Sequence, residues 1–315
     1  MKKGVVVKST GSWYTVKMEE ETIACRIVGR FRLEGHRLTN PVAVGDQVMV
    51  EVEDLEERTG VIRKILPRTN YVLRQSPRRK HFMHLMAANI DQALLIVTLR
   101  EPMLKSGFID RYLLMTEPYD IPVIILFNKR DVYQPEDFTR LEQLEEIYQN
   151  IGYTTISASA ITGENIEQLR SLLIHKRTLV SGQSGVGKTT ILNALDPTLG
   201  LREGALSDYS GKGQHTTTFA EMYFLDQQTE IIDTPGIKTL AFNNLEVQDV
   251  AHNFREFFEA SDQCRFHNCT HRNEPSCAVK EAVEKGEISE VRYQNYLMIL
   301  QEIEDQNYWE LHQDY

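Results

Sequence analysis

A glycine-rich run near the middle of the chain has the residue types of a phosphate-binding loop. It reads Gly182-Gln183-Ser184-Gly185-Val186-Gly187-Lys188-Thr189, with Thr190 following. The glycines let backbone N–H groups point inward around phosphates, Lys188 can balance the charge of the β- and γ-phosphates, and the Thr189 hydroxyl can ligate Mg²⁺. A short apolar run precedes the pattern and a helical stretch follows it, as such a loop requires. We therefore expect all nine residues to bind a nucleoside triphosphate with Mg²⁺, and Lys188 and Thr189 to take part in its hydrolysis.

Two later segments could sense the γ-phosphate. An apolar strand leads into Asp233-Thr234-Pro235-Gly236, where the Asp233 carboxylate can reach Mg²⁺ through water and Gly236 can offer its N–H to the phosphate. Between this motif and the loop lies a polar run, 211–218, whose threonines, Thr216 and Thr217 among them, can complete the Mg²⁺ shell. We expect this run to be mobile when the nucleotide leaves.

The run Asn128-Lys129-Arg130-Asp131, at the end of an apolar stretch, could read a purine base. Guanine presents N1–H and an exocyclic amine, two donors that the Asp131 carboxylate can accept together, whereas adenine places an acceptor there. The pattern therefore favours GTP over ATP. Its expected partner is Ser159-Ala160, whose backbone can hydrogen-bond the guanine carbonyl; Ser157-Ala158 is a competing register, ranked second because a T-G-E turn into a helix follows Ser159.

The order of these motifs is unusual, because the base-reading run precedes the phosphate-binding loop. In an ordinary small GTPase the loop opens the domain, so here the sheet has been cut elsewhere and its old ends joined through a helix near 164–175. The sequence thus predicts a circularly permuted domain. Since the segment from Asp233 to Gly236 then leads out of the domain, nucleotide state could be transmitted to the C-terminal part.

The C-terminal part carries the spacing of a metal site, with Cys264, Cys269, His271 and Cys277 as its expected ligands. Three thiolates and one imidazole make a closed tetrahedral Zn²⁺ site, which is structural because no position remains for water. His267 is a rival fourth ligand. The fourth cysteine of the chain, Cys25, lies alone in a β-rich run and is expected to be a core residue.

Three domains are expected to position these residues. Residues 1–73 hold five short β-rich runs, typical of an OB-fold-like barrel that binds RNA, although an SH3-like barrel also has five strands. Residues 74–240 alternate buried strands with helices, which indicates a parallel α/β sheet, and residues 241–315 predict a helical zinc-binding domain. The charged segment 74–81 is interpreted as a linker, or equally as a strap that contacts RNA.

Charge and composition narrow the class of protein. The first 80 residues hold 16 basic and 10 acidic side chains, whereas the other 235 hold 19 and 35. This asymmetry suits an N-terminal part that contacts an anionic polymer, and the net charge of −10 argues against RNA binding over the whole surface. The longest apolar runs are far below the ~18–20 residues of a bilayer span, so we expect a cytoplasmic protein with no membrane partner.

The three motif sets, in this order along nearly the whole chain, resemble the ribosome small-subunit-dependent GTPase A (RsgA) family. The resemblance implies a bacterial cytoplasmic GTPase, monomeric, that binds GTP and GDP and the 30S subunit late in its maturation. It also implies that the subunit stimulates hydrolysis and that the barrel and zinc domain contact 16S rRNA. The chain departs from the family at Gln214, where an arginine is usual, and at Thr189-Thr190, where serines are usual. The hydroxyls are kept, but the missing charge at 214 could weaken a ribosome contact.

The attacking water lacks an evident partner. Ras-like enzymes orient it with a glutamine just after D-x-x-G, but Ile237 stands there and has no suitable group. Unassisted hydrolysis should therefore be slow. We expect His215 to orient the water once the ribosome orders its loop, as the resemblance also suggests. The alternative is a non-enzymatic, GTP-responsive RNA-binding assembly factor, which Ile237 favours.

Overall fold

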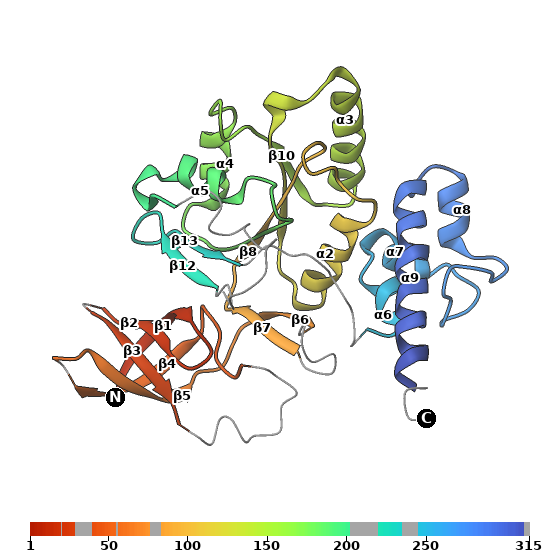
Figure 1. Cartoon of the computed structure of the whole chain (residues 1–315). Coiled ribbons are helices and arrows are strands. Elements are labelled where there is room, and N and C mark those ends of the chain that lie inside the picture. Colours follow the sequence, from red (N-terminus) through yellow and green to blue (C-terminus); the bar gives the residue numbers. More distant parts are fainter. Residues whose placement is uncertain are drawn as a thin grey trace.

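The computed structural model describes residues 1–19, 21–28, 40–54, 56–75, 83–201, 220–234 and 245–311, with backbone alone at 74–75 and 306–311. Three parts follow one another along the chain: a small barrel, a sheet flanked by helices, and a helical part at the opposite side from the barrel (Figure 1). In the described residues, no helix combines the length and apolar character that a bilayer crossing needs.

The barrel closes on itself. Its strands are β1 (Lys2–Ser9), β2 (Tyr14–Lys17), β3 (Thr22–Ile27), β4 (Gln47–Asp54) and β5 (Thr59–Ile65). They pair in the order β1-β2-β3-β5-β4, and β4 pairs back to β1, so each strand has two neighbours. Alternate residues such as Tyr14, Val16, Val48 and Val50 point inward and are fully buried. Cys25 lies in the same core, which confirms that it is a core residue.

The central sheet has both faces covered. Its strands are β8 (Gln92–Val97), β9 (Val123–Phe127), β10 (Thr154–Ser157), β11 (Arg177–Gly182), β12 (Glu221–Phe224) and β13 (Glu230–Asp233), in the order β10-β9-β8-β11-β13-β12. The helices are α2 (Phe108–Thr116), α3 (Pro135–Asn150), α4 (Ile166–Leu173) and α5 (Lys188–Leu195), with 3-10 turns η1 (Glu117–Tyr119), η2 (Arg130–Val132) and η3 (Pro197–Leu199).

Burial on both faces explains the continuous apolar runs of this sheet. Leu94 and Ile96 of β8 pack in one core with α4 and α5, whereas Leu95 and Val97 pack in a second core with α2 and α3. The pairings from β10 to β13 are parallel, as expected. The edge strand β12 differs, because it pairs antiparallel with β13 after a short turn.

A hairpin that the sequence did not predict joins the barrel to the sheet. It consists of β6 (Tyr71–Gln75) and β7 (Met83–Ala88), paired antiparallel. Two residues of the expected linker, Arg74 and Gln75, are therefore part of a strand and pair with His84 and Met83. Residues 76–82 lie outside the described part of the chain.

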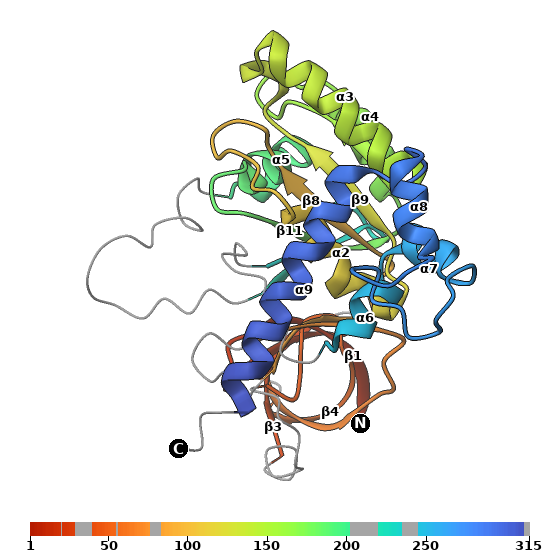
Figure 2. The same cartoon turned by 90° about the vertical axis from the view of Figure 1, so that its right-hand side faces the viewer.

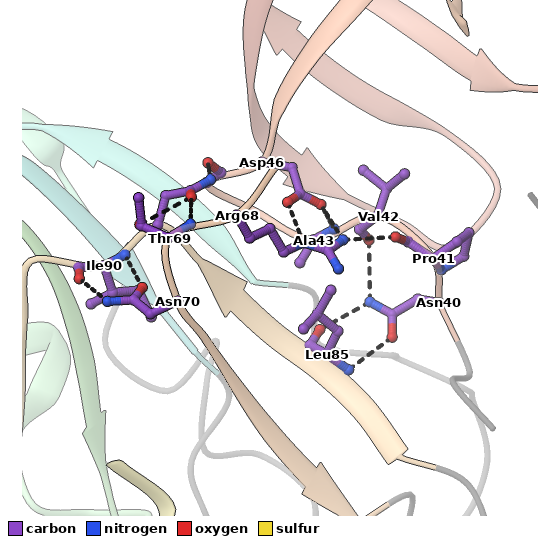
Figure 3. Close-up of polar contacts among 12 residues, drawn as sticks. Asn40, Pro41, Val42, Ala43, Asp46, Arg68, Thr69, Asn70, Leu85 and Ile90 are labelled. Carbon is purple, nitrogen blue, oxygen red and sulfur yellow. Dashed lines mark hydrogen bonds and ion pairs between the residues drawn. The ribbon is translucent and has the colours of Figure 1, made fainter. Parts of the chain in front are cut away.

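Polar side chains fix the barrel to this hairpin and tie together the two segments that flank the hairpin (Figure 3). The amide of Asn40 bonds the Leu85 backbone twice, through its Nδ2 to the carbonyl oxygen (2.9 Å) and its Oδ1 to the N–H (3.0 Å). The Arg68 guanidinium donates to both carboxylate oxygens of Asp46 (2.6 and 2.8 Å) and to the Pro41 carbonyl (2.9 Å). Asn70 holds the Ile90 backbone in the same double manner as Asn40 holds Leu85.

The barrel also touches the central sheet itself. At the joint, Arg177 of β11 donates to the carbonyl oxygens of Gly45 (3.1 Å) and Asn89 (3.2 Å). Gly45 has φ +92°, and a Cβ there would lie 2.1 Å from the Ala88 carbonyl oxygen, so only glycine fits. A single pairing, Lys8 of β1 with Glu221 of β12, continues the sheet into the barrel, and the two side chains form an ion pair (3.0 Å).

The C-terminal part consists of α6 (Val247–His252), α7 (Arg255–Ser261), α8 (Ala278–Glu284) and α9 (Glu290–Leu311). α8 and α9 are separated by a turn at Gly286, whose φ is +75°. Figure 2 shows α9 lying along the side of the molecule, with α2 behind it. The buried Arg292 of α9 donates to Asp110 of α2 (2.6 Å) and twice to Glu256 of α7 (2.7 and 2.8 Å). This ion network joins the C-terminal part to the central domain.

Candidate nucleotide site and metal centre

The glycine-rich loop connects the end of β11 to the start of α5, as predicted. Gly182 passes so close to β8 that a Cβ would lie 2.5 Å from the Ile96 carbonyl oxygen. Gly185 and Gly187 have φ of +84° and +89°, backbone conformations that residues other than glycine rarely adopt. Gln183 is half-buried and Ser184 exposed, while Val186 packs into the core beneath the loop. The loop therefore has the curvature that lets backbone N–H groups surround an anion.

Lys188 and Asp233 lie together in the floor of the site. Both are buried, and the Lys188 Nζ is 3.9 Å from Asp233 Oδ1 and 3.2 Å from the Thr234 carbonyl oxygen. Burial raises the pKa of Asp233 to about 6 although Lys188 acts to lower it, and burial lowers the pKa of Lys188. The Lys188 ammonium and the Asp233 carboxylate each need a partner of opposite charge in this site. A phosphate group would pair with the lysine and a metal cation with the aspartate.

The oxygen atoms around this pair suit a magnesium ion. Asp233 Oδ1 is buried and receives no hydrogen bond from the described residues. The Thr189 hydroxyl group belongs to a buried residue at the first turn of α5, and Thr190 beside it is half-buried. Carboxylate and hydroxyl oxygens are the ligands that Mg²⁺ prefers. The residues present therefore fit the ion that the sequence predicts.

The base-reading run meets the glycine-rich loop directly. Asn128, buried at the end of β9, donates through Nδ2 to the Val186 carbonyl oxygen (2.8 Å). A Cβ on Gly187 would lie 2.5 Å from that same Nδ2, so the third glycine makes room for the asparagine. Residues predicted from two separate motifs, 58 positions apart, therefore form one contact.

Ser159 and Asp131 also come together. The Ser159 hydroxyl donates to Asp131 Oδ1, and the serine is buried while Asp131 is exposed at the rim. The Ala160 N–H reaches Asn128 Oδ1 (3.4 Å), and Arg130 pairs with Glu164. The geometry favours the register at Ser159, because Ser157 lies within β10.

Four predicted residues lie outside the described part of the chain: His215, Thr216, Thr217 and Gly236. The same holds for Gln214 and Ile237. Sequence reasoning also missed two residues beside the site. Glu221 pairs with Asp233 across β12 and β13, and Tyr133 bonds the backbone of Asn128. Neither carries a motif signal, since each position is defined only by the folded neighbours.

The predicted metal ligands converge on one point. Ligand atoms of Cys264, Cys269, His271 and Cys277 all lie within 4.8 Å of one another. The His271 Nδ1 is 3.7 Å from the Cys264 sulfur and 3.4 Å from the Cys277 sulfur. Tetrahedral zinc with ordinary bond lengths would place such atoms about 3.5–3.8 Å apart. The rival ligand, His267, is exposed and not part of the cluster.

Cys269 and Cys277 of the cluster are buried, and its loop is held by neighbouring side chains. Burial raises the pKa of Cys269 to about 12 and raises that of Cys277, so these thiols keep their protons unless a metal ion displaces them. The ligand loop is held from outside, because Tyr293 and Tyr296 of α9 donate to the carbonyl oxygens of His271 (2.7 Å) and Thr270 (2.9 Å). The centre is thus part of the packing of α9.

Comparisons with known proteins agree over the whole chain. The family model described as RsgA GTPase matches residues 65–243, and the RsgA N-terminal domain model matches residues 3–62. The small ribosomal subunit biogenesis GTPase RsgA of Christiangramia forsetii is 46% identical over 305 residues, covering 96% of this chain and 97% of the relative. Its counterpart in Flavobacterium psychrophilum is 46% identical over 307 residues, which cover 97% of this chain and 94% of that relative.

Solved structures give the same result. YjeQ from Thermotoga maritima is 36% identical with a TM-score of 0.76, covering 96% of this chain and 98% of that one. YloQ, described as a circularly permuted GTPase, is 30% identical with a TM-score of 0.72, and the match covers 97% of this chain and 96% of YloQ. The likeness includes the barrel, the permuted sheet and the helical C-terminal part.

Proposed function

The chain belongs to the RsgA GTPase family, and from that premise we propose that it hydrolyses GTP to GDP and phosphate during maturation of the small ribosomal subunit. Membership in a GTPase family confirms the predicted enzyme over the non-enzymatic alternative. The observation that carries the proposal is the contact of Asn128 with the glycine-rich loop, because it joins base reading and phosphate binding in one site.

Each predicted residue has a proposed role in that site. The loop from Gly182 to Thr190 surrounds the phosphates, with Lys188 as the cation nearest to them. Thr189 and Asp233 would hold Mg²⁺, which would supply positive charge to stabilise the transferring phosphoryl group. The guanine-reading residues are Asn128, Lys129, Arg130, Asp131, Ser159 and Ala160. We keep Thr216, Thr217 and Gly236 as γ-phosphate contacts and His215 as the residue that orients water.

The metal of the C-terminal cluster is proposed to be Zn²⁺, with a structural role. Three thiolates and one imidazole are the ligands of closed zinc sites, and four protein ligands leave no position for water. The support of the loop by Tyr293 and Tyr296 agrees with this role, since a structural ion stabilises the elements packed around it.

The proposed partner is the 30S subunit with its 16S rRNA. The excess of basic side chains in the first 80 residues supports it, as does Trp13 of the closed barrel, an exposed aromatic residue with the Arg26 guanidinium 5.5 Å from its ring. We also propose that the protein acts in the cytoplasm, as a monomer. Most of its large exposed apolar side chains, among those described, lie on different elements, and only Val291 and Met298 share one, α9.

The test is GTP turnover of the purified protein alone, with 30S subunits and with 50S subunits, using ATP as the nucleotide control. We expect strong stimulation by 30S alone and no ATP turnover. Equal stimulation by both subunits would refute the 30S subunit as the specific partner. A His215→Ala variant that keeps full stimulated turnover would refute the role of His215 but not the function.

The base assignment has its own test. In Asp131→Asn, the carboxylate that accepts from guanine becomes an amide that can donate to the C2 carbonyl of xanthine. We expect the variant to prefer xanthosine diphosphate over GDP. An unchanged preference for GDP would show that Asp131 does not read the base.

A further inference from the structure

A buried tyrosine connects the guanine-reading run to a neighbouring loop. Tyr133 directly follows η2, and its side chain lies in the core, edge-on to Phe138 of α3. Its hydroxyl donates to the Asn128 carbonyl oxygen (2.9 Å) and accepts from the Leu99 N–H (3.1 Å). One oxygen atom therefore satisfies two buried backbone groups that belong to different segments.

The second of those segments is the bracing loop, residues 98–102, which follows β8. It contacts the reading run again where the Lys129 Nζ donates to the Glu101 carbonyl oxygen (2.5 Å). It also reaches α3, because Arg100 pairs with Glu136 and Asp137 in the first turn of that helix. The loop thus contacts the reading run directly at Lys129 and indirectly through Tyr133 and α3.

The backbone of the reading run needs such support. Lys129 has φ +63°, in the left-handed region, which is unfavourable for a residue other than glycine. This turn directs the Asn128 carbonyl oxygen to the Tyr133 hydroxyl, while the Asn128 N–H bonds the Val97 carbonyl oxygen (2.8 Å). Without the hydroxyl, the carbonyl of Asn128 and the N–H of Leu99 would both lose a buried hydrogen bond.

We propose that Tyr133 is a positioning residue for guanine recognition: its hydroxyl fixes the Asn128 backbone against the bracing loop, which keeps Asn128 on the phosphate-binding loop and Asp131 in reach of the base. The proposal rests on the proposed function of residues 128–131 as the base reader. Tyr133 itself acts through Asn128 and needs no contact with the nucleotide.

The experiment compares Tyr133→Phe with Tyr153→Phe, a matched control. Tyr153 is also buried, and its hydroxyl donates to Glu117 (2.8 Å), at the side of the domain that meets α7. Dissociation constants are measured for GDP, inosine diphosphate and ADP. Inosine lacks the exocyclic amine, so it makes one bond fewer to Asp131 and reports on that carboxylate.

In Tyr133→Phe we expect GDP to bind about five- to thirtyfold more weakly, because one or two hydrogen bonds of about 1 kcal/mol each are lost. The ratio of GDP to inosine diphosphate affinity should fall, KM for GTP should rise, and kcat should stay within about twofold. Tyr153→Phe should keep nucleotide affinities and their ratio. A merely structural role would lower stability in both variants without changing the ratio.

Two outcomes would overturn the proposal: unchanged GDP affinity in Tyr133→Phe, or an equal loss in Tyr153→Phe. Arg100→Met provides a second variant, which loosens the bracing loop from α3 at a partly exposed pair and should weaken GDP binding in the same direction by a smaller factor. Failure of Asp131→Asn to change base preference would instead refute the base reader, so the two failures are distinguishable.

Discussion

Replacing Arg68 with methionine should destabilise the barrel strongly. The Asp46 side chain is 0% exposed and accepts two bonds from Arg68 and one from the Ala43 N–H (2.8 Å). In the variant, the Ala43 bond alone would remain for a buried carboxylate. Loss of one partner from a buried ion pair costs about 3–5 kcal/mol, and we expect the lower value because the Arg68 side chain is 21% exposed and water can enter.

The matched control is Arg63→Met in the same barrel. Arg63 pairs with Glu51, but these side chains are 43% and 52% exposed, so the expected loss is about 0–1 kcal/mol. The assay is urea unfolding followed by Trp13 fluorescence in a Trp309→Phe background. With a slope of about 1–3 kcal/mol per M of urea, 3 kcal/mol lowers the barrel midpoint by at least about 1 M.

The reasoning would be refuted if the two variants unfolded within about 0.3 M of each other. A double variant, Arg68→Met with Asp46→Asn, provides the internal check. It removes the buried charge as well as its partner, so it should be more stable than Arg68→Met alone.

Further predictions concern the nucleotide site, the metal and the barrel core. Gly187→Ala should lower GDP affinity more than tenfold and also lower the melting temperature, since its Cβ would displace the Asn128 amide and alanine is strained at a φ of +89°; titration with labelled GDP and thermal unfolding measure the two effects. Cys277→Ser should lose the bound metal ion, which elemental analysis of the purified protein detects, and should destabilise α8 and α9. Burial raises the pKa of Cys25 to about 12, so its thiolate is scarce at pH 8 and increases only as the pH rises toward that value. Alkylation followed by mass spectrometry should therefore find Cys25 unmodified at pH 8 in the native protein and modified after unfolding.

The features that follow from local pattern were predictable. Short β-rich runs located the five barrel strands, and the glycine-rich loop and base-reading run carry chemistry that fixes their spacing. The metal cluster was predictable for the same reason, although spacing alone left His267 as a rival to His271.

The joints between the parts were not predictable, because they depend on partners far apart in the sequence. Asn40 bonds Leu85, 45 residues away, and Asp110 meets Arg292, 182 residues away. Nothing in the residue types marks these partners before the chain folds. The hairpin β6–β7 was missed because the charged residues between its strands resemble a linker.

The attachment of the barrel has a consequence for how the molecule is made. The barrel closes through pairings among its own strands, all within the first 65 residues, but its bonds to the sheet require Arg177 and Glu221. At about 5–20 residues per second, synthesis takes roughly 8–30 s to pass from the end of β5 to Glu221. Each new chain thus passes through a stage with a closed barrel on a tether and no complete nucleotide site. The proposed binding of RNA by the barrel would then precede control by GTP.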